Sequence, residues 1–160
     1  MIIELRRFFE NDDIKQDFSY EFDAGDEIID SPVSVNGYVK NSTGIVSMSA
    51  EAVFTVSTQC AKCAKDIRKK LTVPVKHFLI DQLNDEDNDD YIVVENLSLN
   101  LDELVLDDIY LSFPTRFLCK SDCKGLCPYC GNDLNENECA CKKPVDPRLA
   151  ALQSLLSDDE

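Results

Sequence analysis

Apolar and polar positions alternate most regularly over residues 46–56. Every second position there, from Val46 to Val56, is apolar, and mostly serine, threonine or glutamate stands between. A period of two residues is typical of a β-strand with one buried face and one wet face. This segment is therefore predicted to form a half-buried strand.

Weaker patterns predict further strands on either side. Asn41–Gly44 (NSTG) has the residues of a tight turn, and Pro74 favours a sheet edge or a bulge because proline has no N–H to donate. The predicted strands are a short one through Phe18, Tyr20 and Phe22, then Val33–Val39, Leu71–Ile80 and Tyr91–Glu95.

Two segments favour helices. Asn100 and Glu103 have the spacing of a capping box, Leu101, Leu104, Val105 and Ile109 share one helical face, and Pro114 ends the helix. Asp146-Pro147 begins a last short helix with a leucine stripe at 149, 152, 155 and 156.

The predicted fold class is α+β. An antiparallel β-sheet is accompanied by one or two short helices and by a cysteine-rich C-terminal segment stapled by zinc. Residues 1–118 are expected to form the sheet and helix, with a CxxC pair on a hairpin, and residues 119–160 the cysteine-rich appendix, packed together as one compact unit.

The composition of the chain indicates that its eight cysteines serve a purpose other than stabilising a small core. The chain has 160 residues, 44% of them hydrophobic, so its core does not need covalent help. No run approaches the ~18 apolar residues of a membrane helix, and Met1–Asp13 lacks the apolar stretch of a signal peptide. These features favour the cytosol, where clustered cysteines more often hold metal than disulfides.

Cys127-Pro-Tyr-Cys130-Gly131 has the form of a zinc knuckle. Two thiolates two residues apart can clamp one ion, and the following glycine allows the tight turn that aims backbone amides at sulfur. Cys139 and Cys141 can complete a tetrahedral site with four cysteine ligands. No further ligand set suggests a catalytic zinc, which would keep one position open for water.

Cys60, Cys63, Cys119 and Cys123 remain, and they suit a second site that joins the hairpin tip to the start of the appendix. In a competing arrangement, Cys119 and Cys123 join the knuckle. The spacings favour two zinc ions over iron–sulfur, although four thiolates alone do not decide between them. Cys60-Ala-Lys-Cys63 could also be a redox pair, but strand pattern rather than a helix follows it. The single histidine, His77, is expected to be a packed or surface residue of its strand.

The segment from Leu118 to Asn135 (LCKSDCKGLCPYCGNDLN), followed by Cys139-Ala-Cys141 and Asp146-Pro147-Arg148, resembles the YceD family of bacterial and plastid large ribosomal RNA subunit accumulation proteins. The upstream CxxC and the helix that ends at Pro114 are similar too, so the resemblance spans most of the chain after about Val33. It implies a role in accumulation of the large-subunit ribosomal RNA. Some members lack most of the C-terminal cysteines, which implies a structural staple rather than a catalytic centre.

Charge is unevenly distributed along the chain. Thirty-one acids against 16 bases give a net charge of −15, which excludes uniform wrapping of nucleic acid. Stretches 62–76 and 116–148 nevertheless hold 12 of the 16 bases and only six acids. Residues 81–90 form an acidic loop without the glycine and terminal glutamate of a calcium loop. The predicted RNA-binding residues are Lys62, Lys65, Arg68, Lys69 and Lys70.

These features predict a non-enzymatic, zinc-binding, cytoplasmic factor for large ribosomal subunit biogenesis that binds precursor particles, through RNA or a basic ribosomal protein. No acid–base pair, phosphate loop or nucleophile triad points to catalysis. Two alternatives stay open: an acidic chaperone for a basic large-subunit ribosomal protein, and a thiol redox protein that uses the CxxC pair.

Overall fold

The computed structural model describes residues 1–81 and 91–141. They form two compact units. Among the described residues, the sheet unit consists of Met1–Ala61 and Lys65–Cys119, and the cysteine-rich unit of Lys62–Ala64 together with residues 120–141. The predicted acidic loop after Asp81 and the predicted last helix lie outside the described residues.

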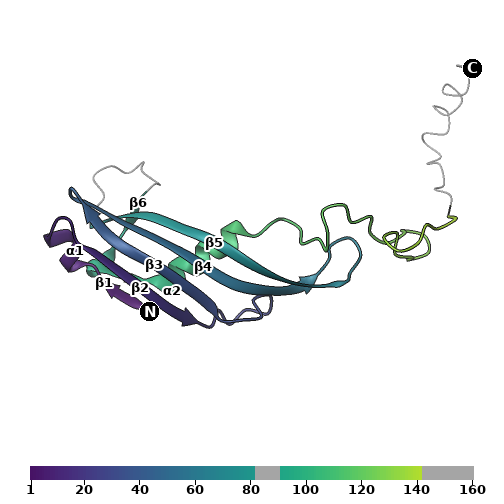
Figure 1. Cartoon of the computed structure of the whole chain (residues 1–160), viewed down its shortest axis with the longest axis horizontal. Coiled ribbons are helices and arrows are strands. Elements are labelled where there is room, and N and C mark those ends of the chain that lie inside the picture. Colours follow the sequence, from purple (N-terminus) through teal and green to yellow (C-terminus); the bar gives the residue numbers. More distant parts are fainter. Residues whose placement is uncertain (82–90, 142–160) are drawn as a thin grey trace, which may run out of the picture. The chain divides into compact units, whose positions relative to one another are not determined.

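The sheet unit is built around a five-stranded sheet with the order β2-β3-β4-β5-β6 (Figure 1). Its strands are β2 (Lys15–Phe22), β3 (Val33–Ser42), β4 (Ile45–Gln59), β5 (Asp66–Ile80) and β6 (Tyr91–Val93). The remaining elements are β1 (Ile2–Glu4) paired with β7 (Ser98–Asn100), α1 (Arg6–Glu10), a 3₁₀ turn η1 (Glu95–Leu97) and α2 (Leu101–Ser112).

The predicted α+β class with an antiparallel sheet is confirmed. Strands β2 to β5 pair antiparallel with their neighbours, whereas β6 runs parallel to β5. The predicted turn joins β3 to β4 through Thr43 and Gly44, both with positive φ. Positive φ at both central residues matches the right-handed twist of a hairpin. Asn41 fixes this turn by accepting from the Gly44 N–H at 2.9 Å.

Strand β5 is longer than its hydrophobic pattern predicted. Its pairing with β4 is continuous from Val46 opposite Leu79 to Gln59 opposite Asp66, so the predicted start at Leu71 is wrong. Residues 66–70 are mostly charged, but ladder hydrogen bonds use the backbone and permit charged side chains on an exposed hairpin. Pro74 lies where β5 has only β4 as a described strand neighbour, which confirms the predicted edge position.

The core lies between the sheet and α2. The alternating residues of β4 are buried, including Val46, Met48 and Phe54, and the buried residues of α2 face them. Figure 1 shows α2 behind the strands. The opposite side of the sheet is called here the open face, because no described element of this unit covers it. No helix among the described residues is long and apolar enough to cross a membrane.

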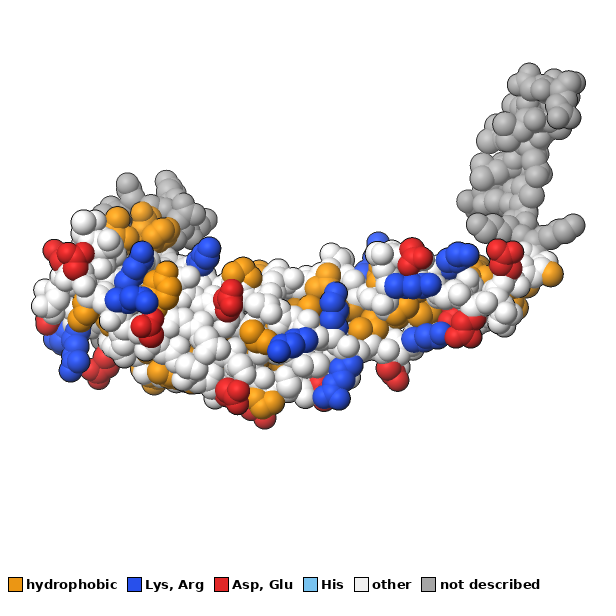
Figure 2. All heavy atoms as spheres, in the orientation of Figure 1, with side chains coloured by type: hydrophobic (Ala, Val, Ile, Leu, Met, Phe, Trp, Pro, Cys, Tyr) orange, Lys and Arg blue, Asp and Glu red, His pale blue; other side chains and the backbone are white. Residues whose placement is uncertain are grey.

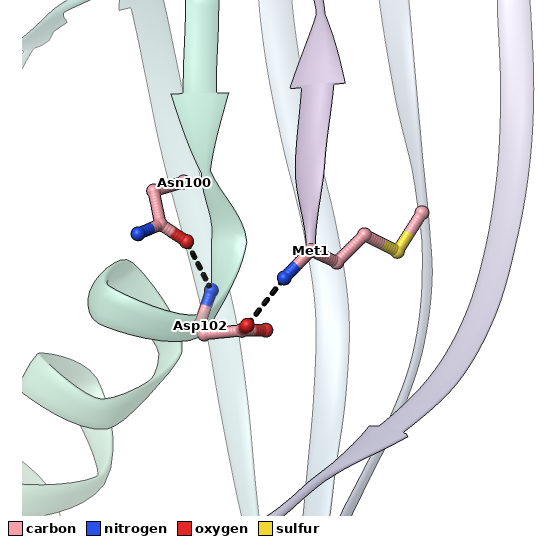
Figure 3. Close-up of polar contacts among 3 residues, drawn as sticks. All are labelled: Met1, Asn100 and Asp102. Carbon is pink, nitrogen blue, oxygen red and sulfur yellow. Dashed lines mark hydrogen bonds and ion pairs between the residues drawn. The ribbon is translucent and has the colours of Figure 1, made fainter.

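Helix α2 begins and ends as its sequence predicts. The Asn100 Oδ1 atom accepts from the Asp102 N–H at 3.3 Å, and the Met1 amino group contacts the Asp102 carboxylate (Figure 3). Phe113 is extended, with φ −63° and ψ 134°, as the residue before a proline should be. His77 Nε2 lies 2.7 Å from the Asp108 Oδ2 of this helix, so the histidine fastens β5 to α2.

Candidate metal centres

The upstream CxxC pair occupies the turn between β4 and β5. Its first cysteine directly follows β4, and the Cys60 N–H donates to the Lys65 carbonyl at 2.8 Å. Strand β5 follows at once, without the helix that would lower a CxxC thiol pKa through its N-terminus. The Ala61 N–H donates to the Phe117 carbonyl, and the Cys119 N–H donates to the Cys60 Sγ at 3.4 Å.

Four sulfur atoms form the first cluster, called the upstream tetrad: Cys60, Cys63, Cys119 and Cys123. Their Sγ atoms lie within 4.8 Å of one another, and all of these residues except Cys119 are buried. The Asn135 side-chain amide donates to the Cys123 Sγ at 3.4 Å. Such a donor stabilises negative charge on sulfur, as hydrogen bonds to the thiolate ligands of a metal ion do.

The second cluster, called the knuckle tetrad, lies wholly within the cysteine-rich unit and consists of Cys127, Cys130, Cys139 and Cys141. Its Sγ atoms also lie within 4.8 Å of one another. Four sulfurs at about 2.3 Å from one zinc ion are separated by about 3.8 Å in a tetrahedron. Both clusters could therefore hold a metal ion with only small side-chain adjustments.

The knuckle is formed by a tight turn of backbone around its first cysteine. The Gly131 N–H donates to the Cys127 carbonyl at 2.9 Å, and the Cys127 N–H donates to the Asn132 carbonyl at 2.8 Å. Gly131 adopts a φ of 72°, which a side-chain-bearing residue would adopt only with strain. This requirement explains the glycine that directly follows Cys130.

The electrostatics of the knuckle tetrad favour a bound cation. Hydrogen bonds from the backbone N–H groups of Cys130 and Tyr129 lower the pKa of the Cys127 thiol to about 6. The Cys141 thiol has its pKa raised to about 12 by its hydrogen bond to Cys130, by burial and by the neighbouring negative charge. Four thiolates this close repel one another unless a cation shares their charge, so the cluster suits a divalent metal.

Apolar burial is almost absent from the cysteine-rich unit. Among its described residues, the buried hydrophobic side chains are Cys63, Cys123 and Cys127 only. Backbone contacts add an isolated bridge between Leu126 and Asp133 and a bond from the Leu134 N–H to the Gly125 carbonyl. A segment whose buried hydrophobic side chains are all cysteines would depend for its folding on a metal ion bound by the sulfur atoms.

The ligand set of each cluster favours a structural metal site. Each candidate ion would have four protein thiolates and no open position for water or substrate, which is the arrangement of structural rather than catalytic zinc.

The predicted RNA-binding residues have different contact partners and lie on different faces of the sheet. The Lys62 Nζ donates to the Cys123 carbonyl at 3.0 Å, and Arg68 forms an ion pair with Asp30 at 2.9 Å. By strand alternation, Arg68 and Lys70 lie on the open face of the sheet, whereas Lys69 lies on the opposite face. Lys65 stands directly before β5.

The structure adds two basic residues, Lys15 and Lys40, that the sequence pattern did not single out. Lys15 and Lys40 pair across β2 and β3 and share the open face with Lys76, far from them in sequence. The alternation of side chains along each strand indicates which face each lysine occupies, but only the register between the strands brings the three lysines together.

Comparison with known proteins identifies relatives. The model of the family described as "Large ribosomal RNA subunit accumulation protein YceD" matches residues 48–156. A Bacillus subtilis protein named YlbN is 31% identical over 139 residues, covering 81% of this chain and 77% of its own length. A Mycobacterium tuberculosis protein is 28% identical over 124 residues, covering 74% of this chain, and this chain spans only 58% of its length. No solved structure matches the chain.

Proposed function

Since this chain belongs to the YceD family, we propose that it is a non-enzymatic, zinc-binding factor that supports accumulation of the large-subunit ribosomal RNA by binding precursor particles. The family match over residues 48–156 is the observation that carries this proposal. A ribosomal role would place the protein in the cytoplasm.

Zinc is proposed for both tetrads. Four thiolates suit zinc, iron or iron–sulfur clusters, but a tight knuckle with a following glycine is typical of structural zinc. Cys60 and Cys63 of the upstream tetrad belong to the turn that precedes Lys65, Arg68 and Lys69, so a bound ion would hold the start of β5 in place. The role of the metal is then to order the surface that binds RNA.

The basic residues near that turn are proposed to contact ribosomal RNA. The side chain of Arg68 is 71% exposed despite its ion pair with Asp30, and exposed ion pairs are weak enough to exchange for a phosphate. Lys69 and Lys70 are exposed too. A net charge of −15 over the whole chain would then confine RNA contact to such basic regions.

Sedimentation of cell lysates on sucrose gradients tests this proposal. We expect the protein to travel with large-subunit precursors, and the triple variant Lys65→Glu, Arg68→Glu, Lys69→Glu to shift to the top of the gradient while its melting temperature stays close to that of the parent. Arg6→Glu with Arg7→Glu serves as a control: it reverses two exposed bases of α1 that are not among the proposed RNA-binding residues, so this variant should sediment as the parent does.

Digestion with RNase before sedimentation separates RNA binding from protein binding. If the protein remains attached to a basic ribosomal protein after digestion, and the triple variant binds as the parent does, RNA contact at this turn is refuted. The acidic-chaperone alternative then takes its place.

A further inference from the structure

The open face carries a cluster of aromatic and basic side chains at the end of the sheet where β6 pairs with β5. The strand register places two adjacent rows across this face. The first row is Lys15, Lys40, Ser47, Phe78 and Tyr91, and the second is Asp17, Tyr38, Ser49 and Lys76. Figure 2 shows hydrophobic side chains flanked by Lys or Arg side chains in the region where Figure 1 labels β6.

Small residues make this part of the face concave. Ser47 and Ser49 on β4 lie between the longer side chains of β3 and β5, and a hollow of about 370 Å³ forms over them. Tyr38, Lys40, Lys76 and Phe78 are among its lining residues. The hollow falls within the size range of small-ligand sites, roughly 300–1,000 Å³.

Two of the rings on this face are accessible to a ligand. Phe78 is 50% exposed and Tyr91 is 38% exposed, and their ring centroids lie 6.0 Å apart. An exposed phenylalanine on a strand costs free energy in water and offers a flat apolar face to a ligand. Tyr38 contributes a third ring, with the Lys15 Nζ 4.6 Å from its centroid.

Charge identifies the kind of ligand. The two rows contain three lysines and one aspartate, and Asp17 is paired with Lys15 at 2.8 Å. In a chain with a net charge of −15, such a cluster is complementary to a polyanion. Aromatic rings interleaved with lysines are what sequence-tolerant binding of single-stranded nucleic acid requires, since bases stack on the rings while lysines neutralise phosphates.

We propose that this platform, defined by Tyr38, Lys40, Lys76, Phe78 and Tyr91, binds unpaired nucleotides of RNA. Bases stack on Phe78 and its neighbouring rings, and Lys40 and Lys76 contact the phosphates. Duplex RNA does not fit, because paired bases cannot present their faces to the rings. The inference rests on the proposed function, which it extends by adding base stacking at one end of the face whose other end carries Arg68 and Lys70.

Binding of purified, zinc-loaded full-length protein to a short fluorescein-labelled oligouridylate, measured by anisotropy at several salt concentrations, tests the platform. We expect Phe78→Ala to weaken binding about 5- to 150-fold, as loss of one stacking partner does. Lys40→Gln with Lys76→Gln should lower the slope of log K against log salt by about 0.7 for each phosphate that the variant no longer neutralises. Photocrosslinking with a thiouridine oligomer should modify Tyr38, Phe78 or Tyr91.

Matched controls keep the experiment specific. Tyr110→Ala removes an aromatic ring that is 44% exposed but lies on α2, away from the open face. Arg6→Gln with Arg7→Gln removes the same charge from exposed positions of α1. Neither control should change affinity for the oligomer by more than about twofold, because surface substitutions elsewhere leave the platform intact.

The outcomes separate the platform from the proposed function. If Phe78→Ala binds the oligomer as the parent does, or if crosslinks fall only on residues 119–141, the platform is refuted even when sedimentation with precursors persists. If the parent binds the oligomer through Phe78 but never sediments with precursors, the platform stands and the proposed function fails. If the parent stays bound to particle proteins after RNase digestion and Phe78→Ala loses that binding, the face contacts a protein partner and the inference is overturned.

Discussion

Replacing Cys127 by serine should unfold the cysteine-rich unit and leave the sheet unit folded. Cys127 is the most centrally bonded cysteine of the knuckle tetrad: its N–H donates to the Asn132 carbonyl, and its own carbonyl accepts from the Gly131 N–H. The substitution removes one of the four proposed ligands. The pKa of the Cys127 thiol is lowered to about 6, whereas the hydroxyl of the new serine stays neutral.

The expected magnitude follows from how little else holds the segment. Among the described residues of this unit, the buried hydrophobic side chains are three cysteines, each worth no more than about 1–3 kcal/mol on burial. A structural zinc site contributes about 10–16 kcal/mol of folding free energy. Losing even half of one site, roughly 5–8 kcal/mol, is comparable to the whole stability of a typical domain.

Amide hydrogen exchange followed by mass spectrometry measures this effect segment by segment. Peptides that contain Cys127, Gly131 and Leu134 should exchange roughly a thousandfold faster or more in the variant, because their hydrogen bonds close only in the folded knuckle. Peptides from residues 46–56 should be unchanged, since that strand packs in the core of the sheet unit. Ser121→Ala, an exposed change in the same segment, is the matched control.

Two results would contradict this reasoning. Unchanged exchange around Gly131 in Cys127→Ser would mean that the knuckle is ordered without its fourth sulfur. Equal loss of protection in residues 46–56 would mean that the two units do not unfold separately.

Three further outcomes are expected. Native mass spectrometry should show the chain plus two zinc ions, and a mass equal to the bare chain would refute metal binding. Ile109→Ala, at a fully buried position of α2, should lower the free energy of unfolding by about 2–5 kcal/mol, measured as a shift of the denaturant midpoint of the sheet unit. Gly37→Ala should destabilise the sheet by about 1–3 kcal/mol or more, because the new Cβ would lie 2.4 Å from the Ala50 Cβ and 2.5 Å from the Ser49 carbonyl oxygen; an unchanged melting temperature would show that β3 can move away from β4.

Local patterns determined much of this protein. The alternation over residues 46–56 was enough to predict β4, because burial of one sheet face demands a period of two. Asn100 and Pro114 marked the limits of α2 correctly, since capping and proline geometry act over a few residues. The spacing of Cys127 and Cys130 likewise indicated a knuckle before any distance was known.

Short elements and non-local partners were decided only by the tertiary structure. Strand β1 and helix α1 have three and five residues, too few for a periodic pattern, and they are held by contacts such as the Asn41 amide donating to the Phe8 carbonyl at 2.7 Å. Strand β5 extends back to Asp66 because Gln59 of β4 lies opposite, which the charged side chains alone would not suggest.

The grouping of distant side chains has the same origin. Cys60 and Cys119 are 59 positions apart, and Lys15, Lys40 and Lys76 come from three different strands. Sequence spacing fixes which residues can share one turn or one strand face, because those relations depend on neighbouring backbone geometry. Which strand lies beside which, and in what register, depends on burying the whole core at once, and that register alone places the lysines and rings of the open face side by side.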